Sequence, residues 1–469
     1  MCWFSKPFSR ECSLVQYIPF SPTFEKMVNF LLVFRNHRFV KWFLIAIGLI
    51  FTLLCLVKAQ RVYKASPVEA NVGADKHERP SPPPPPPPIT DPFPLLATSS
   101  PPSIPSWNIP KKDLYKQYGV EYPPPLFIGF TRNWPILLQA VVSYITAGWP
   151  ADQIYVIENT GTQWANARGK LSLQNPFYLN HGQLKKLGVN VIQTPVLLTF
   201  AQLQNFYIHL AHQHNWPYYF WSHMDVIVVS HEGGREGGVR KAGSPGYLTI
   251  YEECLMELNK TLATDDHWAL RFFSYDALTL VNRAASDDVG GWDANIPYYI
   301  TDCDMYQRFA MKRFSMGAPS AGVVYDTNTV LKDLLAFYRD PSVDIAFVDP
   351  NPPADADGKN LLHYQGNLET DVSEPSSLAY WRRLKLTAET MQKYKREGPR
   401  GRNTWQASQQ GGQGEPYYYP SRGIAVAFEM TAQLGRDMFV KKWGQASCEL
   451  IKEGHLNFED QWREKSNPP

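Results

Sequence analysis

The chain has 469 residues and a formal net charge of +2, with 46 Lys and Arg against 44 Asp and Glu. Because the basic residues are scattered and almost balanced, this composition argues against a nucleic-acid-binding protein. The 6 cysteines are too dispersed for a disulfide scaffold, and the pairing of those in the folded region, Cys254, Cys303 and Cys448, is left open.

The N-terminal region contains one uncharged apolar run, residues 42–57, with the sequence WFLIAIGLIFTLLCLV. The run is short for a hydrocarbon core of about 30 Å, but Lys41 and Lys58 can extend their ammonium groups toward the interface. Residues 1–41 carry an excess of Lys and Arg, which favours a cytoplasmic N-terminus. We therefore expect a cytoplasmic tail over 1–41 and a transmembrane signal anchor over 42–57. A buried helix of a soluble domain is the alternative.

Residues 58–125 are rich in proline and include an unbroken proline run from Pro82 to Pro88. Proline fixes φ and removes backbone donors, so the segment is expected to be extended polyproline II, a stem that separates a head from a membrane. The alternative is a proline-rich ligand for a cytosolic partner.

The remaining residues, 126–469, are expected to form an α/β head. Apolar and β-branched runs alternate with stretches of helical spacing, a pattern typical of βαβ units around a mainly parallel, Rossmann-like sheet. Such a sheet places its site at the carboxyl ends of the strands. The expected strands are 126–133, 153–161, 189–195, 216–230 and 267–285, with 296–314 passing from strand to helix. The expected helices are 134–148, 200–215, 248–262, 376–396 and 422–443.

The strand expected over 216–230, WPYYFWSHMDVIVVS, contains a histidine and a carboxylate within an apolar run. A buried carboxylate is costly unless it is paired or binds a metal. His223 and Asp225 are two residues apart, so in an extended strand they would point to the same side. We expect them to bind Mn²⁺ or Mg²⁺, with Mn²⁺ favoured by the imidazole and His363 of LLHYQG as a third ligand. The alternative is a His–Asp hydrogen bond inside the sheet and a structural His363.

Two aspartates, Asp302 and Asp304, lie in TDCDMYQRF at the start of an expected helix. A carboxylate positioned beside a hydroxyl can accept its proton as a general base. We expect Asp302 in that role and Asp304 as the alternate. The competing interpretation is that both carboxylates cap the helix.

Polar residues also follow the first two expected strands. Arg132 and Asn133 of GFTRN lie where a nucleotide base or phosphate binds in a doubly wound sheet. A turn with a solvated arginine is the alternative. The further candidates for nucleotide contact are Asn166 and Arg168 in the loop 160–168, and Asn205 in the helix before the expected metal strand.

Together these motifs resemble the GT-A-fold glycosyltransferases, over about Leu126 to Gly366. IYVIENTG followed by ARGKL is similar to the β-1,4-galactosyltransferase family, GFTRNW matches its nucleotide loop, SHMDVIV its metal motif and TDCDMYQRF its acidic base motif. The chain departs from that pattern where His223 replaces the first metal-motif aspartate and Thr301 replaces the glutamate before the base.

The resemblance implies a metal-dependent inverting transferase that moves a sugar from a nucleotide-sugar donor to a glycan or glycoconjugate hydroxyl. An anchor, a stem and a catalytic head are the arrangement of Golgi membrane enzymes with a lumenal head, in which residues 379–469 would be a helical C-terminal part. The alternatives are a non-catalytic, membrane-tethered carbohydrate-binding protein and a nucleotidyltransferase. The latter is disfavoured because no glycine-rich, lysine-bearing phosphate loop follows the first strand. Donor, acceptor, linkage and oligomeric state are not specified by the sequence.

Overall fold

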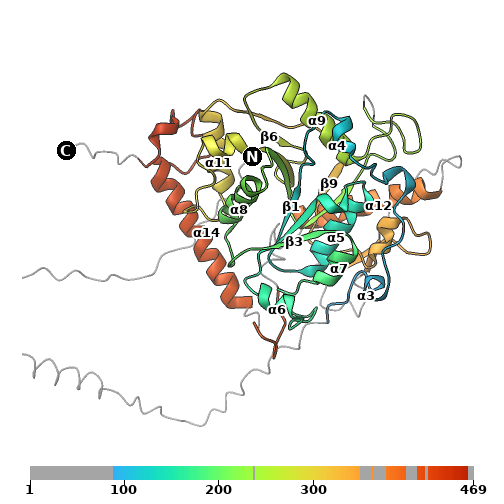
Figure 1. Cartoon of the computed structure of the whole chain (residues 1–469). Coiled ribbons are helices and arrows are strands. Elements are labelled where there is room, and N and C mark those ends of the chain that lie inside the picture. The colour runs from blue at the N-terminus through green and yellow to red at the C-terminus, as the bar shows by residue number, and fades with distance from the viewer. Residues whose placement is uncertain are drawn as a thin grey trace, which may run out of the picture. The chain divides into compact units, whose positions relative to one another are not determined.

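The computed structural model describes residues 88–235, 238–348, 361–363, 376–397, 409–417 and 421–462 (Figure 1). The expected cytoplasmic tail, the expected anchor over 42–57 and most of the expected stem lie outside these residues. Within the described ranges, no helix combines the length and the apolar character needed to cross a bilayer.

The head is built on one seven-stranded sheet with the order β3-β2-β1-β4-β7-β6-β8. Strand β7 is antiparallel to both of its neighbours, β4 and β6, and every other pairing in the sheet is parallel. The expectation of a mainly parallel α/β sheet is therefore confirmed. The strands are β1 (Leu126–Phe130), β2 (Ile154–Glu158), β3 (Asn190–Gln193), β4 (Tyr218–Ser222), β6 (Trp268–Phe272), β7 (Leu278–Asn282) and β8 (Ser315–Gly317).

The strand order reverses at β1. From β1 the chain moves outward through β2 to β3, and it then returns so that β4 pairs with the other side of β1. In open α/β sheets, ligands bind outside the carboxyl ends of the strands at such a reversal. This reversal determines where the candidate site lies.

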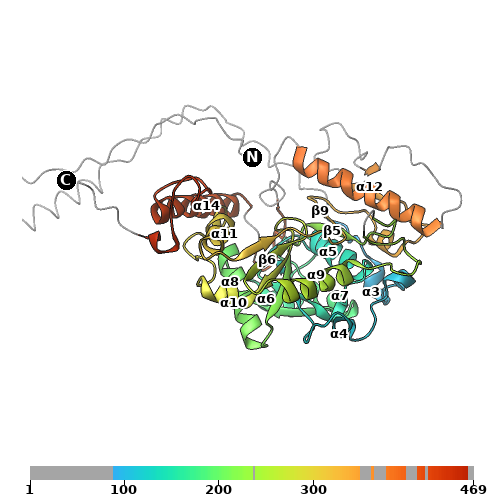
Figure 2. The ribbon, with the colours of Figure 1, turned by 90° about the horizontal axis from the view of Figure 1, so that it is seen from above.

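Helices cover both faces of the sheet, because successive side chains of each strand point to opposite faces. In β1, Leu126 and Ile128 pack into the core that contains α5, whereas Phe127 stacks on Tyr207 of α8 with ring centroids 5.1 Å apart. Figures 1 and 2 show α8, α10 and α11 on one side of the sheet, and α5 and α7 on the other. The main helices are α5 (Trp134–Thr146), α7 (His181–Lys186), α8 (Phe200–Gln213), α9 (Ile250–Thr264), α10 (Arg283–Asp288), α11 (Thr301–Met311), α12 (Ser376–Glu397) and α14 (Ser421–Trp443).

The chain contains further short elements. Residues 88–125 include α3 (Leu95–Thr98) and α4 (Leu114–Gln117), and α6 (Gln163–Ala167) follows β2. Two small antiparallel sheets lie beside the main one. Their strands are β5 (Val226–Val229) with β9 (Val323–Asp326), and β10 (Ala346–Val348) with β11 (Leu361–His363).

The single strand expected over 216–230 is in fact two strands in different sheets. β4 ends at Ser222, whose hydroxyl donates to the carbonyl oxygen of Ala277 at 2.9 Å, and β5 then pairs with β9. Both halves are buried, so the apolar run continues across the break and hides it. The His223–Asp225 segment is therefore a bend between two sheets.

Two other expected strands differ as well. The run 267–285 is a hairpin of β6 and β7, closed by a turn in which the amide of Ala277 donates to the carbonyl oxygen of Ser274 at 2.9 Å. The segment before α11 is a turn, since Ile300 has φ +69° and the amide of Thr301 donates to the carbonyl oxygen of Tyr298.

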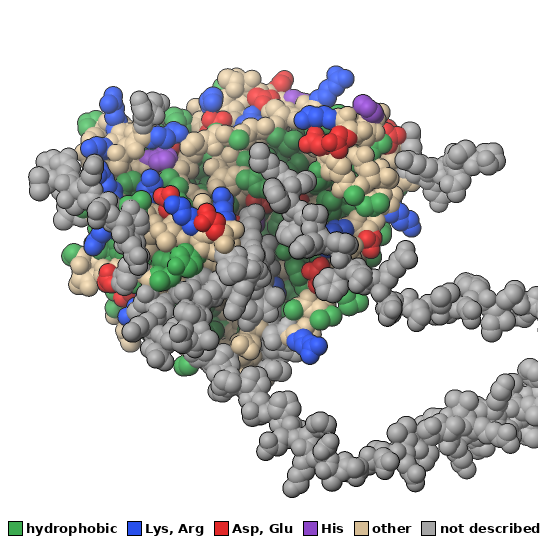
Figure 3. Space-filling view, turned by 180° about the vertical axis from the view of Figure 1, so that it is seen from behind, with side chains coloured by type: hydrophobic (Ala, Val, Ile, Leu, Met, Phe, Trp, Pro, Cys, Tyr) green, Lys and Arg blue, Asp and Glu red, His purple; other side chains and the backbone are tan. Residues whose placement is uncertain are grey.

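The described end of the expected stem packs on the head. Phe93 and Leu96 are fully buried, and the Lys186 ammonium donates to the carbonyl oxygen of Leu96 at 2.7 Å. The head's core therefore includes residues well before Leu126. On the face seen in Figure 3, basic and acidic side chains are interspersed, in keeping with the net charge of +2.

Gly129 of β1 lies where α8 packs closely against the sheet. A Cβ atom at Gly129 would lie 2.5 Å from the Tyr207 hydroxyl oxygen and 2.7 Å from Leu203 Cδ2. We expect Gly129→Ala to lower the free energy of unfolding by about 1–3 kcal/mol through overpacking, measured by denaturant titration. The control is Gly182→Ala in α7, where the added methyl meets Asn180 Oδ1 at 3.4 Å and should not destabilise. Equal stability of the two variants would contradict this packing.

Candidate functional site

The candidate site lies at the strand-order reversal, where β1 and β4 end side by side. Ile128 of β1 is in register with Ser222 of β4, so Arg132 and His223 follow neighbouring strands toward the same edge. Sheets of this kind bind ligands at the edge where the strand order reverses, so this edge is taken as the candidate site.

The positive end of the α5 dipole and the Arg132 guanidinium lie on the β1 side of this edge. Asn133 has φ +73° and caps α5, its Oδ1 accepting from the Ile136 amide at 3.4 Å, with a proline in the first turn. The dipole of a helix this long favours negative charge at its start, although Pro135 has no N–H and the Ile136 amide already donates to Asn133. Arg132 adds a guanidinium whose Nε has no hydrogen-bond partner within the described residues. Burial raises the pKa of Tyr298, and the nearby charge of Arg132 opposes that rise.

On the β4 side, His223 lies between two carboxylates. Its Nδ1 is 3.6 Å from Asp225 Oδ1, and its Nε2 is 3.7 Å from Asp276 Oδ2. Burial disfavours the charged imidazolium, but Asp225 and Asp276 outweigh that effect, so the pKa of His223 is raised above its ordinary value. The two carboxylates therefore stabilise the imidazolium form of His223.

Asp225 is buried against a cation from a distant helix. Lys395 of α12 places its Nζ 2.6 Å from Asp225 Oδ2, also contacts Asp326, and donates to the Thr327 carbonyl oxygen at 3.2 Å. Burial would raise the pKa of Asp225, but the Lys395 charge dominates and holds that pKa well below its usual range.

This arrangement does not fit the expected metal site. One oxygen of Asp225 already binds an ammonium group and the other faces His223. In the described part of the chain, no group of three or more His, Cys, Asp or Glu side chains is placed to hold a metal ion. The backbone of His363 lies in β11 opposite Ala346 of β10. Its side chain is outside the described set, so its role as a ligand stays a prediction.

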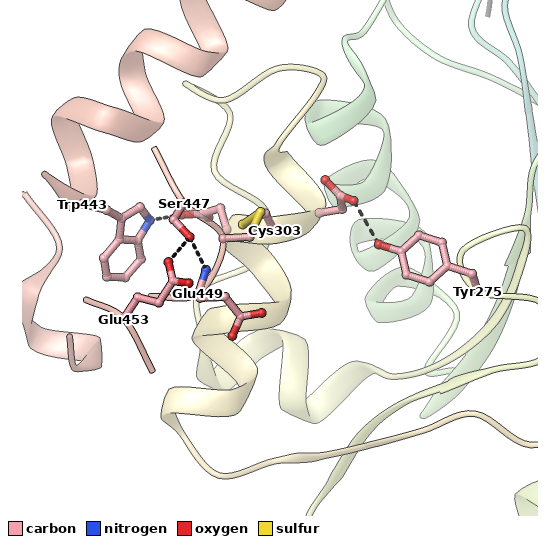
Figure 4. The surroundings of a disulfide bond; sticks show 9 residues. Tyr275, Cys303, Trp443, Ser447, Glu449 and Glu453 are labelled. Carbon is pink, nitrogen blue, oxygen red and sulfur yellow. Dashed lines mark hydrogen bonds between the residues drawn. A yellow bond between two sulfur atoms is a disulfide. The ribbon is translucent and has the colours of Figure 1, made fainter. Parts of the chain in front are cut away.

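Asp276 links Asp302 electrostatically to the region around His223. The Tyr275 hydroxyl donates to Asp302 Oδ2 at 3.3 Å, as the close-up in Figure 4 shows. Burial raises the pKa of Asp302, and the negative charge of Asp276 raises it further. Because Asp276 acts on both His223 and Asp302, the bend after β4 and the start of α11 share one electrostatic environment. A carboxylate with a raised pKa is suited to accept a proton.

Asp304 lies two positions further into α11 and is fully buried. Its oxygens accept from Arg308 Nε at 2.9 Å and Trp443 Nε1 at 2.8 Å, and Lys442 Nζ is also 2.8 Å away. These contacts join α11 to α14. The structure therefore distinguishes the two aspartates that the sequence offered together: Asp302 accepts from the Tyr275 hydroxyl and is influenced by Asp276, and Asp304 lies in an interhelical ion-pair network.

The other expected nucleotide contacts have structural partners. Asn166 is buried, donates to Glu158 and Phe177, and accepts from the Leu179 amide. Asn205 makes a reciprocal pair with the backbone of Trp292, both hydrogen bonds being 2.8 Å long. Arg168 is exposed and lies 3.6 Å from the centre of the Trp164 ring. Their roles as nucleotide contacts stay predictions.

Sequence reasoning did not select four residues that the structure brings to the site: Tyr275, Asp276, Asp326 and Lys395. The SYDA turn signal before β7 could have indicated the hairpin that presents Tyr275 and Asp276. Asp326 ends a strand, where polar residues are common. Lys395 carries no local signal, because its helix contains other lysines and arginines that are exposed.

A disulfide bond lies beside Asp302. Cys303 of α11 is bonded to Cys448, across a sequence separation of 145 residues, and Cys254 is a buried free thiol (Figure 4). The pairing that the sequence left open is thereby resolved. The bond fixes the segment after α14 to the helix that carries the acidic motif.

No protein-family model and no curated protein sequence matches the chain. Among solved structures, the chain is similar to a Pyrobaculum calidifontis mannosyltransferase in complex with GDP-Man and Mn²⁺, at 10% identity and a TM-score of 0.26 over 44% of this chain and 60% of that one. It is also similar to a Leptospira borgpetersenii cytidylyltransferase (10%, 0.26; 42% and 75%) and to S. aureus TarS (10%, 0.27; 46% and 38%). Similarities this loose assign neither fold nor activity.

The disulfide should contribute strongly to stability because it closes a long loop. We expect the Cys303→Ser/Cys448→Ser variant to lose about 2–5 kcal/mol of unfolding free energy, measured by denaturation of the purified full chain. Dithiothreitol should lower the stability of the wild type and of a Cys254→Ala control, and should leave the double variant unchanged. A wild type insensitive to the reductant would contradict the pairing.

Proposed function

We propose that the head is a glycosyltransferase that moves a sugar from a nucleotide-sugar donor to a hydroxyl group of a glycan or glycoconjugate. The observation that carries the proposal is the set of charged groups at the paired carboxyl ends of β1 and β4. One side presents Arg132 and the N-terminus of α5, and the other leads through His223 and Asp276 to Asp302. An anion-binding side facing a raised-pKa carboxylate is what transfer from a diphosphate leaving group requires.

The donor would bind on the β1 side. The Arg132 guanidinium would bind the phosphates, and the dipole of α5 favours negative charge at that edge. The unpartnered Nε of Arg132 gives this side chain a donor that a phosphate oxygen can accept from. These groups stabilise charge as it develops on the leaving diphosphate.

The acceptor would bind on the side of α11. Asp302 would remove the proton from the attacking hydroxyl, and attack from the face opposite the diphosphate would invert the anomeric centre. Tyr275 and Tyr299 expose 59% and 39% of their surfaces near the start of α11, and such rings suit the apolar faces of sugars. The sequence also suggested Mn²⁺ at His223, Asp225 and His363. Because Lys395 binds Asp225, no step is assigned to a metal here.

We further propose that the head is lumenal and belongs to a Golgi-type, single-pass membrane protein. The disulfide supports an oxidising compartment. Asn259 of the Asn259–Lys260–Thr261 acceptor sequence is exposed on α9, which leaves it open to N-glycosylation. The anchor itself rests on the sequence pattern of residues 42–57.

A non-catalytic carbohydrate-binding head is the second candidate. The buried Asp225–Lys395 pair favours it, because a carboxylate that binds an internal cation has lost the role expected of it in a metal-dependent transferase. Calorimetric titration separates the two candidates. A head that binds glycan and no nucleotide sugar supports the second, and a head that binds and turns over a nucleotide sugar supports the first.

The role of Asp302 is tested by Asp302→Asn in the full chain, assayed against a panel of nucleotide sugars. Loss of a general base should lower the transfer rate by about 10²–10⁴-fold, while donor affinity measured by calorimetry stays nearly unchanged. Asp304→Asn is the matched variant two residues away. It should lower the melting temperature by weakening the contacts between α11 and α14. Unchanged transfer by Asp302→Asn would remove this residue from the mechanism.

The pH profile of transfer should report the raised pKa of Asp302. A base must be ionised, so activity should fall as the pH drops through that pKa, which lies above the ordinary 3.8. Asp276→Asn removes the neighbouring negative charge and should move this acid limb to lower pH. Tyr275→Phe removes a hydrogen bond that lowers the pKa, and should move the limb to higher pH. Limbs that coincide in all three proteins would contradict the assignment.

A further inference from the structure

The cation beside Asp225 belongs to the chain itself. Lys395 has 1% of its side chain exposed, and its ammonium group contacts three acceptors, Asp225, Asp326 and the carbonyl oxygen of Thr327. An ammonium group has three N–H donors, so these contacts use all of them. The two aspartates come from β9 and from the bend before β5, and the lysine comes from the C-terminal helix α12.

Two buried carboxylates this close need a compensating positive charge, because an unpaired buried charge is strongly unfavourable. A divalent metal could supply that charge, and so can an ammonium group. The ammonium has one advantage: it is tethered to the protein, so it competes with a dissolved ion at a high effective concentration. Binding of a metal to both carboxylates would require Lys395 to be displaced from its contacts with Asp225 and Asp326.

The packing of α12 holds Lys395 in this position. One turn before it, Gln392 Oε1 accepts from the amide of Asp326 at 3.0 Å. Leu384, Ala388 and Met391 on the same helix are completely buried in the main core. The ammonium group is therefore placed by the fold of the helix against β9, and it is not a freely swinging surface side chain.

A second buried lysine also lies between two aspartates. Lys442 of α14 contacts Asp293 and Asp304, both at 2.8 Å, with 2% of its side chain exposed. Asp304 also binds Arg308, so removal of Lys442 would still leave that carboxylate paired with a cation.

We propose that Lys395 is the resident cation of the Asp225–Asp326 site and that the protein needs no divalent metal there. Lys395 is then a positioning residue: it neutralises Asp225 and fixes the bend that carries His223. The consequence for catalysis, transfer that proceeds in the presence of EDTA, rests on the proposed transferase function. The identity of the cation does not, and it can be tested in the absence of any donor or acceptor.

The test is Mn²⁺ binding by the purified, EDTA-treated full chain, followed by the electron paramagnetic resonance signal of free Mn²⁺. Asp225→Asn should leave the wild-type Mn²⁺ affinity unchanged, because Asp225 binds no metal. Lys395→Met uncovers two carboxylates and should bind Mn²⁺ at least about tenfold more tightly than the wild type. Lys395→Arg keeps the charge and should not gain affinity.

The matched control is Lys442→Met. It also removes a buried lysine from between two aspartates, but Arg308 still occupies Asp304, so it should gain no Mn²⁺ affinity. If Lys395→Met does not fold, the wild type and Asp225→Asn decide the question. Equal affinity and equal melting temperatures with EDTA or Mn²⁺ support the proposal. A wild type that Mn²⁺ stabilises, with the effect lost in Asp225→Asn, overturns it.

Discussion

Buried carboxylates that must be neutralised from elsewhere in the chain determine how this head is assembled. Asp225 lies in the bend before β5, Asp326 ends β9, and Asp304 lies in α11. Each is paired with a lysine from a C-terminal helix. Removing a partner from such a pair leaves an uncompensated charge, which commonly destabilises a protein by about 3–5 kcal/mol. Helices α12 and α14 are therefore structural parts of the site region.

The same constraint separates the acidic residues by function. Asp225 and Asp304 are buried, and neighbouring lysines compensate their negative charges. Among the described residues no cation forms an ion pair with Asp302. It accepts from the Tyr275 hydroxyl, and burial together with Asp276 raises its pKa. Chemistry that needs a proton acceptor at this edge of the sheet is therefore best assigned to Asp302.

The sequence predicted the elements that depend on local pattern. The β1 and β2 strands and helices α5, α8, α12 and α14 agree with apolar periodicity, and Pro135 lies at the start of α5 as expected. The break at His223 was not predictable, since both flanking strands are buried and one apolar run covers them. The pairing of Asp225 with Lys395 spans 170 positions in sequence, and no spacing rule connects residues that far apart. Asp302 and Asp304 look alike in sequence, and their different environments arise from packing against α14.

On this interpretation, the edge at the carboxyl ends of β1 and β4 binds a nucleoside diphosphate on the side opposite Asp302. A crystal structure of the protein with a nucleoside diphosphate tests it most directly. The account predicts phosphate oxygens within hydrogen-bonding distance of Arg132 and the first turn of α5, with Asp302 facing the open side of the terminal phosphate. A diphosphate bound at any other place on the head, with this edge of the sheet unchanged, would contradict it.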